Sequence, residues 1–304
     1  MVDLRDRQAG CLWGLATGDA LGAPVEFSFR DRFPEVREMM SGGKFNLPAG
    51  GWTDDTAMAL CLAQSLLAHP EVDAFDLLTR FWEWAETGKN SSTGQALGFG
   101  QNTLHSLMHF QRTGALKAES RQRRSDGNGS IMRLGPLPIV YVHSMTKAQD
   151  LSRFQSYTTH ASDIAADACE LLTILLCRLM QGRSFDEALA EGLKNADGWH
   201  KDIANIAAGS WRGKSREAIM STGYTAYTLE AACWAVGTTD SFEEALVRAV
   251  NLGFDADTVA AVTGQIAGAL YGKSAIPERW LCSLAQQALL EDTTQALIEL
   301  SADI

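Results

Sequence analysis

Two stretches of the sequence place glycine at every fourth position, and this spacing restricts how the chain can pack. The glycines are Gly10, Gly14, Gly18 and Gly22 in the first stretch and Gly264, Gly268 and Gly272 in the second. Residues four apart lie on one face of a helix, and each glycine inside a helix costs about 0.5–1 kcal/mol relative to alanine. Close approach of two helix backbones offsets that cost. We therefore expect helices over residues 6–22 and 257–271 to pack tightly near the centre of the fold; room for a ligand is the alternative use of these glycines.

Apolar residues recur at helical spacing through most of the chain, whereas alternating strand patterns are scarce. The helical patterns cover residues 6–22, 54–68, 73–87, 94–113, 146–155, 161–181, 185–195, 200–208, 224–237, 241–251, 257–271 and 277–290. Clusters of proline and glycine predict loops at 28–51, 114–130 and 272–277. The sequence contains no linker long enough to divide domains, and 46% of its residues are hydrophobic. We therefore expect one all-α domain over residues 1–304.

The charge and the cysteines argue against several classes of protein. The formal net charge of −11 is unfavourable for a free nucleic-acid surface, which needs clustered Lys and Arg. The one basic run contains Arg121, Arg123 and Arg124, and it predicts either a solvated loop or a segment that attracts a diphosphate or an acidic partner. The cysteines form no CxxC pair and lie in apolar runs. They therefore predict small buried side chains rather than zinc ligands or disulfides.

Nothing in the sequence indicates a membrane protein or secretion. No uninterrupted apolar run reaches the roughly 18 residues of a membrane span. The N-terminal residues MVDLRDRQAG are charged and lack the apolar core of a signal peptide. We expect a cytoplasmic protein, and a monomer because the acidic composition contains no strong interface signal.

Paired acids stand at the start of two predicted helices. The first pair follows Thr53, as Asp54 and Asp55, and the second is Asp255 and Asp257, followed by Thr258. Capping of the two helices is one explanation, because acids in a first turn favour the helix dipole. Neighbouring carboxylates repel, however, unless a cation neutralises them. Oxygen ligands without His or Cys favour Mg²⁺ or Mn²⁺, so we expect the two segments to face one pocket and to bind two such cations about 3.5–4 Å apart.

With these residues in view, the chain resembles the ADP-ribosylglycohydrolase family, and more narrowly its dinitrogenase reductase-activating glycohydrolase branch. The matching blocks occur in the family's order: GCLWGLATGDALGAPVEF (10–27), GWTDDTAMAL (51–60), GNGSIMRLGPLPIVY (127–141), TTHASDIAADAC (158–169), STGYTAYTLEAACWAV (221–236) and NLGFDADTVAAVTGQIAGALYG (251–272). The resemblance implies a single compact, multi-helix orthogonal bundle with a central dinuclear metal site. It also implies an enzyme that removes ADP-ribose from a modified acceptor by cleaving the glycosidic bond at the ribose C1″.

The resemblance assigns roles to the acidic residues one by one. It implies that the metal ligands are Thr53, Asp54, Asp55, Asp255, Asp257 and Thr258. Glu26 matches an acid beside the metals that acts on the water or gates the site, with an exposed loop acid as the alternative. An aspartate of the cluster, Asp55 in our assignment, or Glu26 accepts a proton from the attacking water. Asp19 is expected to orient its helix or a metal ligand from behind.

The resemblance also implies a substrate-binding set. The loop Gly127, Asn128, Gly129 and Ser130 matches a glycine-rich segment that approaches the diphosphate and ribose, and its glycines expose backbone N–H groups to phosphate oxygens; a flexible turn is the alternative. His160 matches a histidine near the ribose and phosphates, and Tyr224 matches an aromatic residue on which adenine stacks. Plain core packing is the alternative for both. Arg133 is expected to be structural.

Two residues depart from the family's pattern. Gly98 stands where the dinitrogenase reductase branch carries the Asp of an FDIG run, and Phe254 stands where many relatives have Gly or Asp. We hypothesise a Mg²⁺- or Mn²⁺-dependent hydrolase whose leading substrate is ADP-ribosylarginine on a protein, with a small ADP-ribosyl conjugate as the other possible partner. The two departures motivate one alternative, a non-hydrolytic ADP-ribose-binding module. A metal-dependent nucleotide phosphohydrolase is the second.

Overall fold

The computed structural model describes residues 2–120 and 125–304, and within these ranges the regular secondary structure is helical apart from two isolated bridges. The helices are α1 (Leu4–Gly22), α2 (Asp54–Ala68), α3 (Ala74–Thr87), α4 (Gln101–Thr113), α5 (Pro136–Val140), α6 (Met145–Tyr157), α7 (Asp163–Met180), α8 (Phe185–Lys194), α9 (Lys201–Ala207), α10 (Thr225–Gly237), α11 (Phe242–Val250), α12 (Ala256–Tyr271), α13 (Glu278–Leu281) and α14 (Gln287–Asp303). The predicted all-α class is confirmed. The basic run at Arg121, Arg123 and Arg124 lies outside the described residues.

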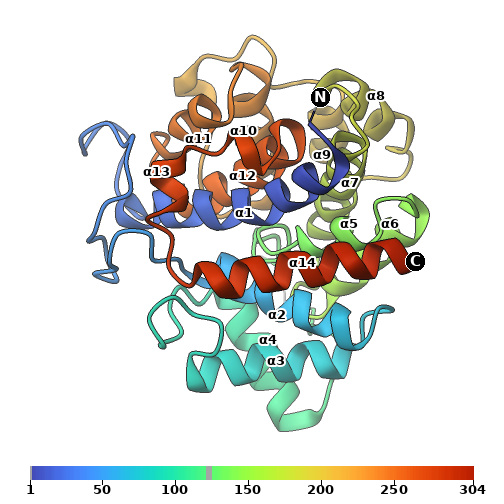
Figure 1. Cartoon of the computed structure of the whole chain (residues 1–304). Coiled ribbons are helices and arrows are strands. Elements are labelled where there is room, and N and C mark those ends of the chain that lie inside the picture. Colours follow the sequence, from blue (N-terminus) through green and yellow to red (C-terminus); the bar gives the residue numbers. More distant parts are fainter. Residues whose placement is uncertain (1, 121–124) are drawn as a thin grey trace.

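Helices α1 and α12 lie side by side at the centre of the molecule (Figure 1). A methyl group added at Gly14 would lie closer than 3.0 Å to the carbonyl oxygen of Gly264, and one added at Gly264 would lie equally close to that of Gly14. Gly10 and Gly268 show the same mutual clash. The two helix backbones are therefore in direct contact along the glycine stripes, which confirms the close packing predicted from the sequence.

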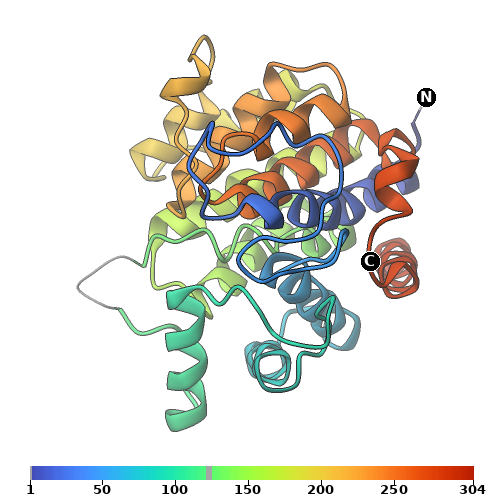
Figure 2. The same cartoon turned by 90° about the vertical axis from the view of Figure 1, so that its left-hand side faces the viewer.

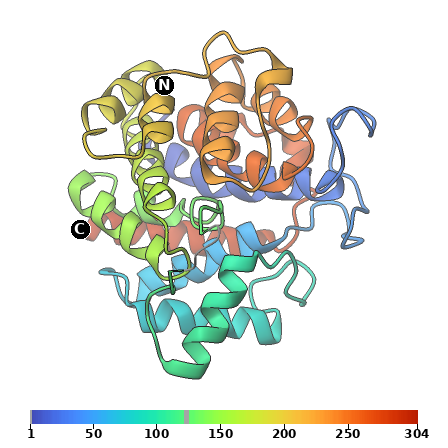
Figure 3. The ribbon, with the colours of Figure 1, turned by 180° about the vertical axis from the view of Figure 1, so that it is seen from behind.

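The other helices cover this central pair. Figure 1 shows α10 and α11 on one side of it and α2, α3 and α4 on the other, with α14 running between α1 and α2. Seen from behind, α6 and α7 lie against the same core (Figure 3). The described part of the chain contains no helix of the length and apolarity that a lipid bilayer requires.

The predicted helix boundaries hold where a short polar residue precedes an apolar run. The side chains of Asp73, Ser162, Ser184 and Ser241 each accept a hydrogen bond from the first turn of α3, α7, α8 and α11 respectively. Such caps satisfy backbone N–H groups that have no partner inside the helix. The sequence shows them directly, so these starts were predictable.

Two expected boundaries were wrong, and one helix was missed. The single helix expected over residues 277–290 is divided: α13 ends at Leu281, and α14 begins at Gln287, directly after Gln286 in a left-handed conformation (φ 42°). Helix α4 begins at Gln101 rather than at residue 94, because Gly94 and Gly98 have positive φ. The short helix α5 was missed because it contains two prolines, which a helix tolerates in its first turn.

Loop contacts bring the start of α12 beside the end of α1. The backbone N–H of Phe27 donates to the carbonyl oxygen of Phe254 at 2.6 Å, and the N–H of Phe254 donates to that of Ser28 at 2.7 Å. This pairing fixes Glu26 next to the acids of α12. In Figure 2 the long loop after Glu26 faces the viewer as a blue trace across the ends of these helices.

Candidate functional site

The two acidic segments meet at one point, although they are far apart in the sequence. The hydroxyl oxygen of Thr53 lies 3.3 Å from Oδ2 of Asp55 and 3.4 Å from Oδ2 of Asp257. Two groups of carboxylates result, Asp19–Asp55–Asp257 and Glu26–Asp255–Asp257, and in each group one oxygen per residue lies within 4.8 Å of the others. The predicted meeting of the segments is confirmed, and Asp257 belongs to both groups.

Asp19 holds the start of α2 in place. Its Oδ1 accepts hydrogen bonds from the backbone N–H and hydroxyl of Thr53, at 2.9 and 2.8 Å. Its Oδ2 accepts the corresponding pair from Thr56, at 2.9 and 2.7 Å. Asp19 is fully buried on α1, so it caps α2 from a neighbouring helix and orients Thr53 from behind.

The acids lie at the starts of α2 and α12, where they favour the helix dipoles, but side-chain capping does not account for their pairing. Thr53 occupies the N-cap position of α2 and Asp255 that of α12, yet neither side chain makes a capping hydrogen bond. Asp255 instead accepts a hydrogen bond from the side-chain amide of Asn128 at 2.6 Å. The carboxylates surround a common space, and they do not form capping hydrogen bonds with the backbone of their own helices.

Burial and mutual repulsion raise the pKa of these acids. Burial raises the pKa of Asp54, Asp55 and Asp257 well above its usual range, and the neighbouring carboxylates raise it further. Burial, followed by the charges of Asp257, Asp54 and Asp255, raises the pKa of Glu26 to about 11. The pKa of Asp255 rises to about 6 through burial, against the hydrogen bond from Asn128. Such a cluster is stable in its ionised form only beside compensating positive charge.

The residues fit divalent cations. Three buried carboxylate oxygens in the cluster have no hydrogen-bond partner: Oε2 of Glu26, Oδ1 of Asp55 and Oδ1 of Asp257. Buried polar atoms without a partner are rare, because desolvation is costly. Clustered carboxylate and hydroxyl oxygens are the donor set that Mg²⁺ and Mn²⁺ prefer.

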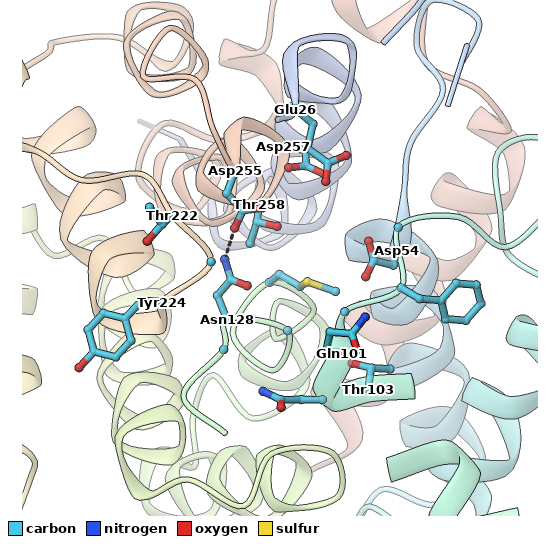
Figure 4. Close-up of a pocket in the computed structure, with 18 of the residues that line it drawn as sticks. Glu26, Asp54, Gln101, Thr103, Asn128, Thr222, Tyr224, Asp255, Asp257 and Thr258 are labelled. Atoms are coloured by element: carbon cyan, nitrogen blue, oxygen red, sulfur yellow. Dashed lines mark hydrogen bonds between the residues drawn. The ribbon is translucent and has the colours of Figure 1, made fainter. Parts of the chain in front are cut away.

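The cluster opens into a pocket of about 880 Å³. Its lining includes Glu26, Asp54, Asp255, Asp257 and Thr258 of the expected set, whereas Thr53 and Asp55 lie beneath the surface, with exposures of 2% and 0%. Figure 4 shows the acids on one side of the pocket and Tyr224 on the other, with Asn128 between them.

An aromatic pair forms the Tyr224 side. The rings of Tyr224 and Tyr227 meet edge to face, with centroids 4.9 Å apart, and both residues line the pocket. The hydroxyl of Tyr224 donates to Asp202 at 3.0 Å, which fixes the direction of its ring. This position suits a flat, aromatic part of a ligand.

The glycine-rich loop rests on His160. Methyl groups added at Gly129 and Gly127 would lie 3.0 Å from Cε1 of His160 and 3.0 Å from Nδ2 of Asn102, respectively. Both glycines therefore bring bare backbone to the pocket wall. Burial, and then the charge of Arg133, lowers the pKa of His160 to about 3. His160 also lines the pocket, and with this pKa its imidazole is neutral near neutral pH.

The other two loop residues differ in where they face. Asn128 lines the pocket, and its side-chain amide donates to Asp255 at 2.6 Å and to Thr228 at 2.8 Å, so it also orients an acid of the cluster. Ser130 is fully buried and accepts a hydrogen bond from the Ser156 hydroxyl at 2.8 Å. It does not line the pocket, and its side chain supports the loop from behind.

Arg133 is structural, as expected. It is fully buried, and its guanidinium donates to the side chain and carbonyl of Gln155 and to the Thr159 hydroxyl. Its guanidinium carbon lies 4.5 Å from the centroid of the Phe81 ring. These contacts join the glycine-rich loop to α6 and leave no role for Arg133 in the pocket.

Gly98 lies directly against the acidic cluster. Its φ is 86°, and a methyl group added there would lie closer than 3.0 Å to Oδ1 of Asp54. A side chain at this position would need both a strained backbone and a displaced Asp54. Glycine in place of the aspartate of the FDIG run thus allows the backbone at residue 98 to lie directly against Asp54.

Sequence reasoning missed part of the lining. The start of α4 contributes Gln101, Asn102 and Thr103, and the N-cap residue Gly100 makes no side-chain capping hydrogen bond. Glycines at 98 and 100 that interrupt the helical pattern were the available signal. Tyr227 was also missed, although it lies three residues after Tyr224 and therefore on the same helix face.

Comparison with known proteins places these features in a family. A sequence model of the ADP-ribosylglycohydrolase family matches residues 1–303. The chain is 38% identical to the ADP-ribosylarginine hydrolase Tri1 of Serratia proteamaculans, over 98% of this chain and 80% of the relative. It is 30% identical to the glycohydrolase of ADP-ribosyl-dinitrogen reductase from Rhodospirillum rubrum, over 92% of this chain and 91% of the relative. A solved structure described as an ADP-ribosylglycohydrolase-related protein complex matches with a TM-score of 0.87 at 39% identity, over 99% of this chain and 100% of that chain.

Proposed function

The chain belongs to the ADP-ribosylglycohydrolase family, and we propose that it hydrolyses the N-glycosidic bond between ADP-ribose and an arginine side chain of a modified protein. One observation carries the proposal. Two clusters of carboxylates, which share Asp257, lie beside a pocket. An aromatic pair lies on the opposite side of this pocket. The relative of higher identity is named for ADP-ribosylarginine, which favours arginine over other acceptors.

In the proposed binding mode, an ADP-ribose unit extends across the pocket from the aromatic pair to the acids. Adenine stacks on Tyr224, beside Tyr227. The diphosphate lies along the bare backbone of Gly127 and Gly129 and near the start of α4, where free helix N–H groups favour an anion. The distal ribose then reaches the acids, so its C1″ faces Glu26 and Asp257.

The proposed ligands of two divalent cations, Mg²⁺ or Mn²⁺, are Thr53, Asp54, Asp55, Asp255, Asp257 and Thr258. When bound, the cations supply a polarised water and stabilise negative charge as the bond breaks. Asp19 and Asn128 position the ligands through their hydrogen bonds to Thr53 and Asp255. Glu26 presents an unpartnered oxygen at the edge of the cluster and is placed to accept a proton from the attacking water.

The intact acidic cluster favours hydrolysis over the two alternatives. A pure ADP-ribose-binding module would not need three unpartnered carboxylate oxygens beside the distal ribose. A phosphohydrolase would need the acids beside the diphosphate, whereas the proposed binding mode places the diphosphate along Gly127 and Gly129, which also line the pocket.

The cellular setting completes the proposal. The cysteines are all free and five of the six are buried, which is typical of a protein in a reducing compartment. We therefore propose that the protein is cytoplasmic. We also propose that it acts as a monomer on ADP-ribosylated proteins. Its net charge of −11 disfavours free nucleic acid as a partner.

A release assay tests the proposal. The purified protein is incubated with ADP-ribosyl-arginine, ADP-ribosyl-serine and O-acetyl-ADP-ribose, each with EDTA, Mg²⁺ or Mn²⁺, and products are separated by chromatography. We expect intact ADP-ribose to appear from the arginine conjugate only with metal. Free phosphate in place of ADP-ribose would support a phosphohydrolase, and calorimetric binding of ADP-ribose without release would support a binding module.

A further inference from the structure

Exposed aromatic side chains follow Glu26 in the sequence, at the pocket and next to it. Phe27 is 55% exposed and lines the pocket, and Phe29 is 67% exposed, the highest value among the large hydrophobic side chains of the described residues. A scattered exposed apolar residue needs no explanation, but apolar residues grouped at a site mark a place of interaction. We call Phe27, Phe29 and Lys44 the rim.

The backbone is held in an unfavourable conformation at Phe27 of the rim and at the neighbouring Phe254. Phe27 and Phe254 have φ values of 63° and 58°. The left-handed region is strained for bulky residues, and such strain concentrates at functional sites. The two residues are kept there by their paired backbone hydrogen bonds, at 2.6 and 2.7 Å. The exposure of Phe27 is therefore imposed by the fold.

Side-chain contacts also fix the segment that carries Phe27 and Phe29. The guanidinium of Arg30 donates to the carbonyl oxygens of Leu252, Arg216 and Ile219, at 3.0, 2.6 and 2.6 Å. The ring of Phe29 meets that of Phe254 edge to face, with centroids 5.5 Å apart. A surface fixed in this way loses little conformational entropy when a partner binds.

The position of the rim indicates which part of the substrate meets it. In Figure 4 Tyr224 lies on one side of the pocket, and Glu26 and Asp54 lie on the other. With adenine on Tyr224 and the distal ribose at the acids, the group attached to C1″ leaves the pocket on the Glu26 side. Lys44 lines this side, and its ammonium lies 4.1 Å from the centroid of the Phe27 ring.

We propose that the rim contacts the polypeptide of the acceptor protein on either side of the modified arginine. This inference rests on the proposed function and narrows its substrate class to arginine-modified proteins with an apolar side chain next to the arginine. Phe29 packs against that apolar neighbour, and Phe27 and Lys44 contact the backbone closer to the pocket. The net charge of −11 disfavours a nucleic-acid acceptor at the same surface.

The test uses two peptides that carry ADP-ribosylarginine, one flanked by leucines and one by serines, together with free ADP-ribosylarginine. For the wild type we expect kcat/KM to be about tenfold higher on the leucine peptide, since part of the Phe29 ring is buried on binding. Phe29→Ser removes this preference through KM and leaves the rate on free ADP-ribosylarginine unchanged. Phe29→Tyr retains the preference because it keeps the ring.

Phe75→Ser is the matched control, because Phe75 is 60% exposed on α3 and does not line the pocket. The control should keep the full preference for the leucine peptide. An equal loss on all substrates in Phe29→Ser, or no preference in the wild type, overturns the proposal. A dependence on Phe29 seen only with an ADP-ribosylated oligonucleotide, or a Phe29-dependent dimer in light scattering, also overturns it.

Peptide binding separates this proposal from the proposed function. Fluorescence anisotropy of the same labelled peptides needs no turnover. Weaker binding of the leucine peptide to Phe29→Ser than to the wild type, with unchanged binding of ADP-ribose, supports the rim even where release fails. Release that proceeds normally with no difference between the two peptides leaves the proposed function intact and overturns the rim alone.

Discussion

At the scale of single residues, Asp257 is the most informative position. It is nearly buried, one of its oxygens has no partner, and it belongs to both carboxylate groups. Asn128 and Asp19 orient its neighbours Asp255 and Thr53. A change at Asp257 should therefore disturb both clusters of carboxylates, whereas a change at Glu26 should disturb only the cluster that contains Asp255.

We expect Asp257→Asn to lower the rate of ADP-ribose release by more than the roughly 100-fold typical of a lost partner of a metal ligand. In EDTA at pH 8 the same variant should melt at a higher temperature than the wild type, because it removes one ionisable carboxyl group from a buried, crowded cluster. Release assays and thermal unfolding check both effects. Asp150→Asn, an exposed position on α6, is the control. Near-normal release by Asp257→Asn in metal-replete buffer would refute the assignment.

The raised pKa values predict an unusual pH dependence without metal. A carboxyl whose pKa is higher in the folded state binds more protons there, so its stabilising effect is complete below the unfolded pKa of about 4. That effect is lost as the pH rises through the folded pKa, which is about 6 for Asp255 and about 11 for Glu26. In EDTA we therefore expect a lower melting temperature at pH 8 than at pH 5.

Added Mg²⁺ or Mn²⁺ should remove this loss, because the cations stabilise the ionised acids; at 100 times its dissociation constant, one ion adds about 2.7 kcal/mol. Differential scanning fluorimetry at both pH values checks the effect. Melting temperatures that are independent of metal at pH 8 would argue against the cation site.

At the scale of elements, the contact between α1 and α12 determines the geometry of the site. Both helices end or begin at the acids, with Asp19 near the end of α1 and Asp257 in the first turn of α12. Because their backbones touch at Gly14 and Gly264, a small change in their separation would move the two carboxylates apart.

Gly14→Ala tests this contact, because close packing and an uncrowded helix predict opposite signs for the change in the free energy of unfolding. In an uncrowded helix, the change from glycine to alanine stabilises by about 0.5–1 kcal/mol. Here the added methyl would collide with the carbonyl group of Gly264. We expect destabilisation of about 3 kcal/mol or more, the upper end for an overpacked core, measured by urea denaturation.

Gly182→Ala serves as the control for Gly14→Ala, because a methyl there meets open space and only its positive φ of 83° opposes it. The expected loss is about 1–2 kcal/mol. A Gly14→Ala protein as stable as the wild type would show that the two backbones are not in contact.

Some helix contacts and boundaries could be predicted from the sequence, and others could not. The glycine stripes predicted the α1–α12 contact because a four-residue period has a direct geometric meaning. The separate start of helix α14 was missed because the break between Leu281 and Gln287 contains no glycine or proline that would mark it. The inward placement of Ser130 was equally hidden, since it depends on Ser156 of α6, which only the folded chain brings near.

At the scale of the whole molecule, loops from distant parts of the chain gather at one end of the central pair. The segment after α1, the start of α4, the glycine-rich loop and the turn before α10 all line one pocket. Backbone hydrogen bonds join them, including Asn128 to Gly223 at 3.1 Å and Asp255 to Ser221 at 2.9 Å. The helices supply a rigid base, and the loops supply the chemistry.

The central claim is that two segments distant in sequence share a pair of divalent cations, and diffraction from crystals grown with Mn²⁺ tests it most directly. We predict two anomalous peaks on either side of Asp257, one beside Asp55 and one beside Asp255, with both peaks lost in Asp257→Asn. No peak at the cluster, or a single ion away from these carboxylates, would contradict the account.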